Sequence, residues 1–164
     1  MSMGALKRAG TVEQALQYLE ENAGRAVILA GGTDLMVQVN QYNYPEETVF
    51  VCVENIPELQ GIYLTEDKIQ IGSLATAAEI AKSPVIQKFA RALVVAAQES
   101  ASPQVRNRAT IGGNIGTASP SADMVTALIA LDAEAEIVGT DGCRTIKVKD
   151  IGTFVKKTCL KETD

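Results

Sequence analysis

Two pairs of adjacent glycines constrain this chain more than any other feature of its sequence. They lie in the segments LAGGTDL (29–35) and TIGGNIG (110–116). Glycine adopts positive φ without strain and leaves no side chain between the backbone and whatever approaches it. With 13 glycines in 164 residues, about one adjacent pair is expected by chance. The pairs alone fit two structural turns, so their surroundings must decide whether they also bind a ligand.

The first pair sits in a pattern typical of a small α/β unit. Segment 10–24 predicts an amphipathic helix that begins after Thr11 as N-cap. Apolar segments predict buried strands at 25–30 and 47–53, and LMVQVNQ (35–41) predicts the start of a short helix. Buried strands that alternate with helices are usually parallel. We therefore expect a parallel sheet here.

The pattern changes in the rest of the chain. Alternating apolar and polar residues predict an antiparallel hairpin at 61–73, and a capping box at 76–79 begins another helix. A single helix is predicted over 83–100, with Ser as N-cap and Pro at its first position. An almost wholly apolar segment, 123–133, predicts a buried helix, and a second hairpin is expected at 135–148, around Asp141-Gly142.

These two patterns predict an α+β protein with two lobes. Residues 1–57 form the N-terminal α/β lobe, and Pro57 marks the boundary. Residues 58–164 form a larger lobe of helices and antiparallel strands.

The surroundings of the glycines favour an anion site. Each pair precedes a predicted helix, so free backbone amides at the helix start could face a negative charge. Thr33, Thr110 and Asn114 add side-chain donors. Two such loops from separate lobes could hold a diphosphate between them. The usual nucleotide motifs are absent, because Thr33 and Asn114 stand where G-x-G-x-x-G requires its second glycine and no G-K-[ST] occurs.

Asp34 and Asp123 lie close to these loops in the sequence. Their carboxylates would repel a diphosphate, but they suit the hydroxyl groups of a sugar or polyol. The alternative for each is a helix N-cap, and Ser119-Pro120 competes with Asp123 for that role. Both interpretations stay open at this point.

Histidine and cysteine usage restricts the chemistry. The absence of histidine removes Ser–His and Cys–His catalytic pairs and most catalytic zinc sites. Cys52, Cys143 and Cys159 are far apart and form no C-x-x-C, so an iron–sulfur or zinc site within this chain is not expected. Unpaired thiols fit a reducing compartment.

Charge and hydropathy argue against a nucleic-acid-binding, membrane-spanning or secreted protein. A net charge of −5 and 4% aromatic residues argue against a nucleic-acid surface. The apolar runs are far shorter than the roughly 18 residues of a membrane span. The N-terminus lacks the apolar region of a signal peptide. We expect a cytoplasmic protein without membrane contact.

Together the two loops resemble the FAD-binding subunit or domain of the xanthine dehydrogenase family of molybdenum hydroxylases. The resemblance rests on LAGGTDL and on TIGGNIGTASPSAD (110–123). Further similar segments are TVEQA (11–15), IPELQGI (56–62), IGSLAT (71–76) and VKDIGTFVKKTCLK (148–161).

The resemblance implies an FAD site that both loops form. The implied site residues are Ile28, Leu29, Ala30, Gly31, Gly32, Thr33, Asp34, Leu35, Thr110, Ile111, Gly112, Gly113, Asn114 and Asp123. Ser100 stands where some relatives place an aromatic side chain, a departure that leaves its role open. Because histidyl attachment is impossible here, the FAD is expected to be non-covalent.

The resemblance also implies an electron-transfer flavin subunit of an oxidoreductase. Its partners would be an iron–sulfur subunit with 2Fe-2S clusters and a molybdenum-cofactor subunit, with NAD(P)+ or another compound as acceptor. The chain stops before the family's C-terminal domain, so we expect an incomplete second lobe and weaker FAD binding. The alternatives are a stand-alone flavoprotein reductase and a scaffold lobe that no longer binds flavin.

Overall fold

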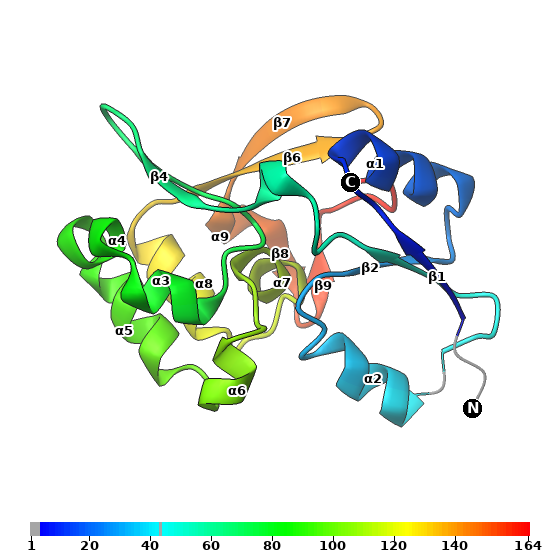
Figure 1. Cartoon of the computed structure of the whole chain (residues 1–164), viewed down its shortest axis with the longest axis horizontal. Helices are drawn as coiled ribbons and strands as arrows, with labels where there is room; N and C mark the ends of the chain where they lie inside the picture. Colours follow the sequence, from blue (N-terminus) through cyan, green and yellow to red (C-terminus); the bar gives the residue numbers. More distant parts are fainter. Residues whose placement is uncertain (1–3, 43) are drawn as a thin grey trace.

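A parallel sheet with its helices and a larger helical part with hairpins make up the structure, a computed structural model that describes residues 4–42 and 44–164 (Figure 1). The N-terminal part contains β1 (Ala5–Arg8), α1 (Val12–Glu21), β2 (Ala26–Leu29), α2 (Leu35–Tyr42), β3 (Val49–Cys52) and the 3-10 helix η1 (Pro57–Leu59). The C-terminal part contains β4 (Ile62–Leu64), β5 (Ile69–Ile71), α3 (Ala77–Lys82), α4 (Pro84–Phe89), α5 (Arg91–Glu99), α6 (Pro103–Arg106), α7 (Ile111–Gly116), α8 (Asp123–Ala130), β6 (Glu134–Gly139), β7 (Gly142–Lys147), α9 (Val148–Ile151), β8 (Gly152–Phe154) and β9 (Lys157–Thr158). The α+β class expected from the sequence is confirmed. Within these ranges, no helix combines the length and the apolar character needed to cross a bilayer.

The N-terminal sheet has the strand order β1-β3-β2 with every pair parallel. The predicted strands at 25–30 and 47–53 are confirmed, and so is their parallel pairing. β1 was not predicted, and it pairs with β3 from Ala5 opposite Val49. The central strand is buried along its whole length. The prediction that β2 is buried is only partly right, because β2 is an edge strand and Ile28 stays 45% exposed.

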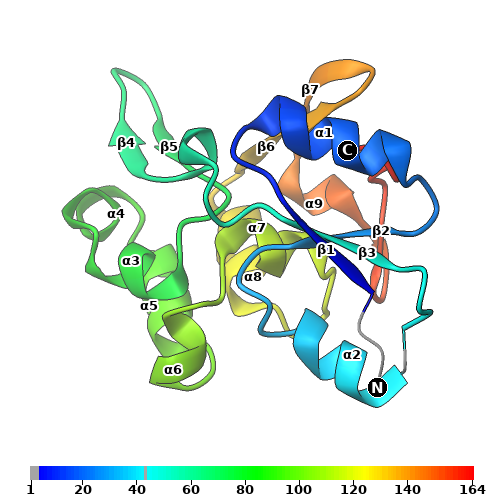
Figure 2. The same cartoon turned by 45° about the vertical axis from the view of Figure 1, so that its right-hand side comes forward.

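Helices α1 and α2 lie on opposite sides of this sheet (Figure 2). Thr11 caps α1 as predicted, since its hydroxyl accepts from the amide of Gln14 at 3.2 Å. The Gln14 side chain accepts in turn from the amide of Gly10 at 2.7 Å. Ala15 and Leu19 face the sheet and are buried with β3 in one hydrophobic cluster.

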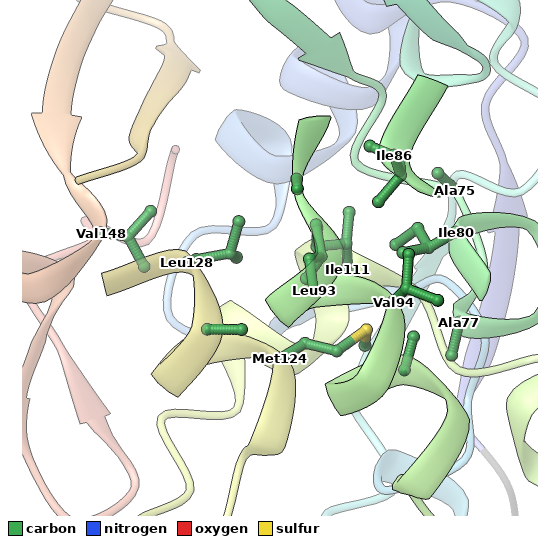
Figure 3. Packing of buried hydrophobic residues seen from close by; sticks show 13 residues of the cluster. Ala75, Ala77, Ile80, Ile86, Leu93, Val94, Ile111, Met124, Leu128 and Val148 are labelled. Carbon is green, nitrogen blue, oxygen red and sulfur yellow. The ribbon is translucent and has the colours of Figure 1, made fainter. Parts of the chain in front are cut away.

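The C-terminal part has its own hydrophobic cluster, built mainly by α3, α5 and α8 (Figure 3). Leu93 and Val94 of α5 belong to this cluster together with Ile80 of α3 and Met124 of α8. The capping box of α3 is confirmed, with the amide of Thr76 donating to the Glu79 carboxylate at 2.7 Å. Both predicted hairpins are also confirmed as the antiparallel pairs β4–β5 and β6–β7.

Two predicted helices differ from the structure. The single helix expected over 83–100 is two helices, because Ala90 leaves the helical region at φ −136° and ψ 52°. The break directs the buried Ile86 and Leu93 on either side of it into the same core cluster. Helix α8 is not buried all round: Ile129 is 44% exposed, since only one face of α8 packs against α5, α7 and α9.

The C-terminal residues return along the β6–β7 hairpin. Arg144 of β7 forms a paired contact with the buried carboxylate of Asp164, and the hydrogen bond from this guanidinium lowers the pKa of the Asp164 carboxyl. The short hairpin β8–β9, which was not predicted, lies beside β2 in both views (Figure 1, Figure 2). This hairpin therefore brings late residues of the chain to the sheet of the N-terminal part.

The two parts meet where Gly31 packs against the backbone of Arg108 and Ala109. The guanidinium of Arg108 pairs with Glu54, just after β3, at 3.1 Å. The carbonyl of Ala109 accepts from the amide of Ala77 at 2.9 Å. The segment just before the second glycine loop is thus attached to both parts of the molecule.

Replacing Gly31 tests this junction. A β-carbon there would overlap the carbonyl oxygen of Arg108 and lie 2.8 Å from the carbonyl carbon, so one backbone would have to move. We expect Gly31→Ala to lower the free energy of unfolding by about 1–3 kcal/mol, measured by urea denaturation followed by circular dichroism.

The matched control is Gly116→Ala in α7, where an added β-carbon meets nothing within 4 Å. Alanine in a helix is favoured over glycine, so this variant should gain about 0.5–1 kcal/mol. If Gly31→Ala were as stable as Gly116→Ala, the proposed close approach at the junction would be wrong.

Candidate functional site

The first glycine loop connects β2 to α2, and glycine is needed at its two positions for different structural reasons. Gly31 allows the close approach to Arg108 described above. Gly32 has φ +73°, a backbone conformation that side-chain-bearing residues rarely adopt, and a β-carbon there would lie 3.1 Å from Leu29 Cδ1. The glycine at 32, unlike that at 31, is therefore required by the shape of the loop itself.

Backbone amides are free along this loop. Among the residues that the structure describes, none accepts a hydrogen bond from the N–H groups of residues 30–35, although the carbonyls of Gly32 and Asp34 accept from Met36 and Gln38. These donors lie at the start of α2, where the partial positive charge of the helix also favours an anion. The first loop has the properties that the sequence predicted.

The second glycine loop differs from the first in that its backbone amides already have hydrogen-bond partners. The amides of Ile111 and Gly112 donate to the carbonyls of Ala75 and Ser73, at 2.9 and 2.8 Å. The amide of Gly113 donates to the Thr110 hydroxyl, which caps α7, at 3.1 Å. The prediction of free amides in both loops is wrong for this one, because its backbone is already paired with residues 73–76.

The two glycines of the second pair also have different roles. A β-carbon on Gly112 would lie 2.8 Å from Ser73 Cβ and 2.9 Å from Ser73 O, so packing within the protein requires glycine there. Gly113 is exposed, and a β-carbon there would meet only the Thr110 hydroxyl, at 2.9 Å. Gly113 is therefore the member of this pair whose surface is open to a ligand.

Asn114 follows Gly113 and carries a polar atom without a partner. Its Oδ1 is buried and accepts no hydrogen bond within the described part of the chain. A buried acceptor left unsatisfied is unfavourable by about 1–3 kcal/mol. A ligand with hydroxyl donors would satisfy this atom, while the free amides of the first loop would donate hydrogen bonds to its anionic group. The residues present thus fit a ligand that carries both a diphosphate and a polyol, as FAD does.

Asp34 is already engaged by side chains. Its carboxylate accepts from Gln38 Nε2 and lies 3.3 Å from Lys156 Nζ. No described backbone amide donates to it. Asp34 directly precedes α2 and its carbonyl accepts from the amide of Gln38, but its side chain does not cap the helix.

Asp123 is exposed and is the first residue of α8, while Ala122 is the N-cap and provides no side-chain hydrogen bond. The Ser119 hydroxyl accepts from Ser121 rather than capping α8. Neither capping alternative describes this segment. The Asp123 side chain is therefore exposed at the start of α8, a helix that packs against α7.

An open cleft of about 780 Å³ borders both loops. Ala30, Gly31 and Thr110 line it together with charged side chains that include Glu54 and Arg108. The two loops are therefore on the same side of the junction, not on opposite sides of the molecule. Several predicted site residues do not line this cleft: Ile28, Leu29, Gly32, Thr33, Asp34, Leu35, Ile111, Gly112, Gly113, Asn114 and Asp123. Among them Ile111 is buried in the hydrophobic core, so its side chain cannot contact a ligand.

Sequence reasoning missed the hairpin β8–β9 as a neighbour of the first loop. Lys156 lies in its turn, and its amide donates to the carbonyl of Ala118, just past α7, at 2.9 Å. Its ammonium contacts Asp34. The only signal in the sequence is a pair of adjacent lysines, which gives no indication of this contact. In the described residues, no group of acidic or cysteine side chains is arranged to hold a metal ion.

Comparisons with known proteins identify the family of the chain. Residues 2–164 match the family model described as the FAD binding domain in molybdopterin dehydrogenase. The chain is 36% identical to the xanthine dehydrogenase FAD-binding subunit of Escherichia coli O157:H7, covering 96% of this chain and 53% of that protein. It is 39% identical to the nicotinate dehydrogenase FAD-subunit of Eubacterium barkeri, covering 84% of this chain and 47% of that one.

The same fold occurs in a solved structure of carbon monoxide dehydrogenase from Hydrogenophaga pseudoflava, with a TM-score of 0.93 and 30% identity over 97% of this chain and 55% of that one. The chain spans about half the length of the curated relatives that it matches. The family model covers nearly all of it. The chain therefore belongs to the family of FAD-binding domains found in molybdopterin dehydrogenases.

Proposed function

We propose that this chain binds FAD non-covalently at the junction of its two parts. The observation that supports the proposal most strongly is the run of free amides at residues 30–35, beside the segment that leads into the second loop. These amides would hold the diphosphate. Asn114 and Asp123 would accept hydrogen bonds from hydroxyl groups of the ligand. Thr33, Thr110 and Gly113 would complete the surface around it.

The remaining members of the proposed site serve the shape of the loops. Ile28, Leu29 and Ala30 bring the chain from β2 into the first loop, and Leu35 begins α2. Gly31, Ile111 and Gly112 hold the two loops against the protein's own backbone and core. We further propose that the lobes divide at Pro57, into residues 1–57 and 58–164. The buried members of the two hydrophobic clusters lie on either side of this boundary, although Leu59 and Leu74 also pack against the N-terminal cluster.

The proposed role is that of an electron-transfer flavin subunit in a molybdenum hydroxylase. Bound FAD would supply the redox chemistry, and the protein's residues would bind and orient it. Electrons would come from 2Fe-2S clusters of an iron–sulfur subunit beside a molybdenum-cofactor subunit, and would leave to NAD(P)+ or another acceptor. The names of the relatives, which include FAD subunits of xanthine and nicotinate dehydrogenases, support this role. The cysteine pattern supports a cytoplasmic location.

Titration of the purified chain with FAD tests the proposal. Binding should quench flavin fluorescence and saturate at one FAD per chain. A chain that is folded by circular dichroism but leaves the flavin fluorescence unchanged would instead be a scaffold lobe, and the proposal would fail.

Enlarging Gly113 should block the ligand while leaving the fold intact. Valine there fills the exposed surface that only the Thr110 hydroxyl approaches. We expect Gly113→Val to lose FAD binding within the range of the fluorescence titration. Its melting temperature without flavin should show that the protein is still folded.

Ala92→Val is the control, since Ala92 is also exposed on a helix, α5. It should bind FAD like the unmodified chain. Normal flavin occupancy in Gly113→Val would place the ligand elsewhere.

Removing the Asp123 carboxylate should weaken FAD binding without abolishing it. A hydrogen bond to a charged group contributes on the order of 1.5–3 kcal/mol, and Asp123→Ala should raise the dissociation constant accordingly. Asp67→Ala is the control, because Asp67 is an exposed acid between β4 and β5. An unchanged dissociation constant for Asp123→Ala would remove Asp123 from the site.

A further inference from the structure

Lys156 is a cation that the fold brings to the first glycine loop from the other end of the chain. Its Nζ lies 3.3 Å from Asp34 Oδ1 and 3.5 Å from Oδ2. Among the described residues, no other cationic side chain makes an ion pair with Asp34. The contact joins the turn between β8 and β9 to the start of α2.

The backbone of Lys156 is held in position even though its side chain is 49% exposed. It has φ +59°, which is uncommon for a residue with a side chain. Its amide donates to the carbonyl of Ala118, and Ala118 also has positive φ, +46°. Such conformations persist where the surrounding structure over-determines them. The turn thus places the backbone of Lys156 beside the end of α7 and its ammonium group at the first loop.

Asp34 raises an electrostatic problem for the proposed site. It lies within the run of free amides at 30–35, where a diphosphate would carry further negative charge. Two unit charges about 4 Å apart interact by about 1 kcal/mol in water and about 4 kcal/mol near a protein surface. An uncompensated Asp34 would therefore oppose the ligand that the amides attract. Gln38 is neutral and cannot cancel this charge.

We infer that Lys156 is a positioning residue for diphosphate binding, which acts by neutralising Asp34 and holding its carboxylate aside. The inference rests on the proposed function and deepens it, because it assigns the charge balance of the first loop to the β8–β9 hairpin. Lys156 acts through Asp34 and need not touch the ligand. Its effect should therefore depend on the charge at residue 34.

A double-mutant cycle tests this dependence. FAD and ADP are titrated separately, because ADP carries the diphosphate without the flavin. Lys156→Gln should raise the dissociation constants of both FAD and ADP by about tenfold. In an Asp34→Asn background, which keeps an acceptor for Gln38, the same substitution should change either affinity by less than about twofold.

Lys157→Gln is the matched control, since Lys157 is the adjacent exposed lysine and begins β9. It should bind both ligands like the unmodified chain. Thermal unfolding of each variant without ligand verifies that the proteins compared are folded.

The outcomes separate the inference from the proposed function. If Lys156→Gln binds as tightly as Lys157→Gln, the inference is overturned. If Lys156→Gln weakens ligand binding by the same factor whether residue 34 is aspartate or asparagine, Lys156 acts on the ligand directly. The inference is then overturned as well. If the unmodified chain binds neither FAD nor ADP, the proposed function itself fails and the inference falls with it.

Discussion

The candidate site depends on a contact between two stretches of backbone, at Gly31 and Arg108. Because Gly31 has no β-carbon, the first loop lies directly against the segment that leads into the second loop. A second contact of the same kind holds Gly112 against Ser73. In each glycine pair, one member joins parts of the protein and the other, Gly32 or Gly113, shapes or opens the surface. The pairs are therefore needed for the assembly of the site as well as for access to it.

The two loops consequently offer a ligand different chemistry. The first presents free N–H donors at the start of α2, whereas the second has used its amides on Ser73, Ala75 and Thr110 and presents the buried acceptor of Asn114. An isolated phosphate would satisfy the donors and leave the acceptor unpaired. A ligand that combines an anionic bridge with hydroxyl groups satisfies both. This difference between the loops favours a dinucleotide with a polyol chain over a simple anion, and it follows from the hydrogen-bond partners and not from the glycines themselves.

Most of the features that the sequence predicted correctly depend on near neighbours, although the parallel pairing of β2 with β3 was also predicted. Thr11 and Thr76 cap helices because their hydroxyls reach amides three residues ahead, and Asp141-Gly142 lies at the turn of the β6–β7 hairpin. Apart from the helix break at Ala90, the features that it missed depend on distant residues. The strand β1 is short and its residues are mostly exposed, so it lacks a periodic pattern and forms only because β3 lies beside it. The occupied amides of the second loop depend on residues 73–76, and no local rule places Lys156 beside Asp34.

In the proposed site, which is assembled from such distant segments, ligand binding would be coupled to the docking of the β8–β9 hairpin. An exposed ion pair such as Asp34–Lys156 contributes only about 0–1 kcal/mol by itself. A ligand that binds the assembled loops and not the unfolded chain adds stability that grows with its concentration, by about 2.7 kcal/mol at a hundred times its dissociation constant. That gain exceeds what the ion pair provides. The hairpin should therefore be held mainly by the main-chain contact to Ala118 in the free protein, and the electrostatic contact should gain importance when an anion occupies the first loop.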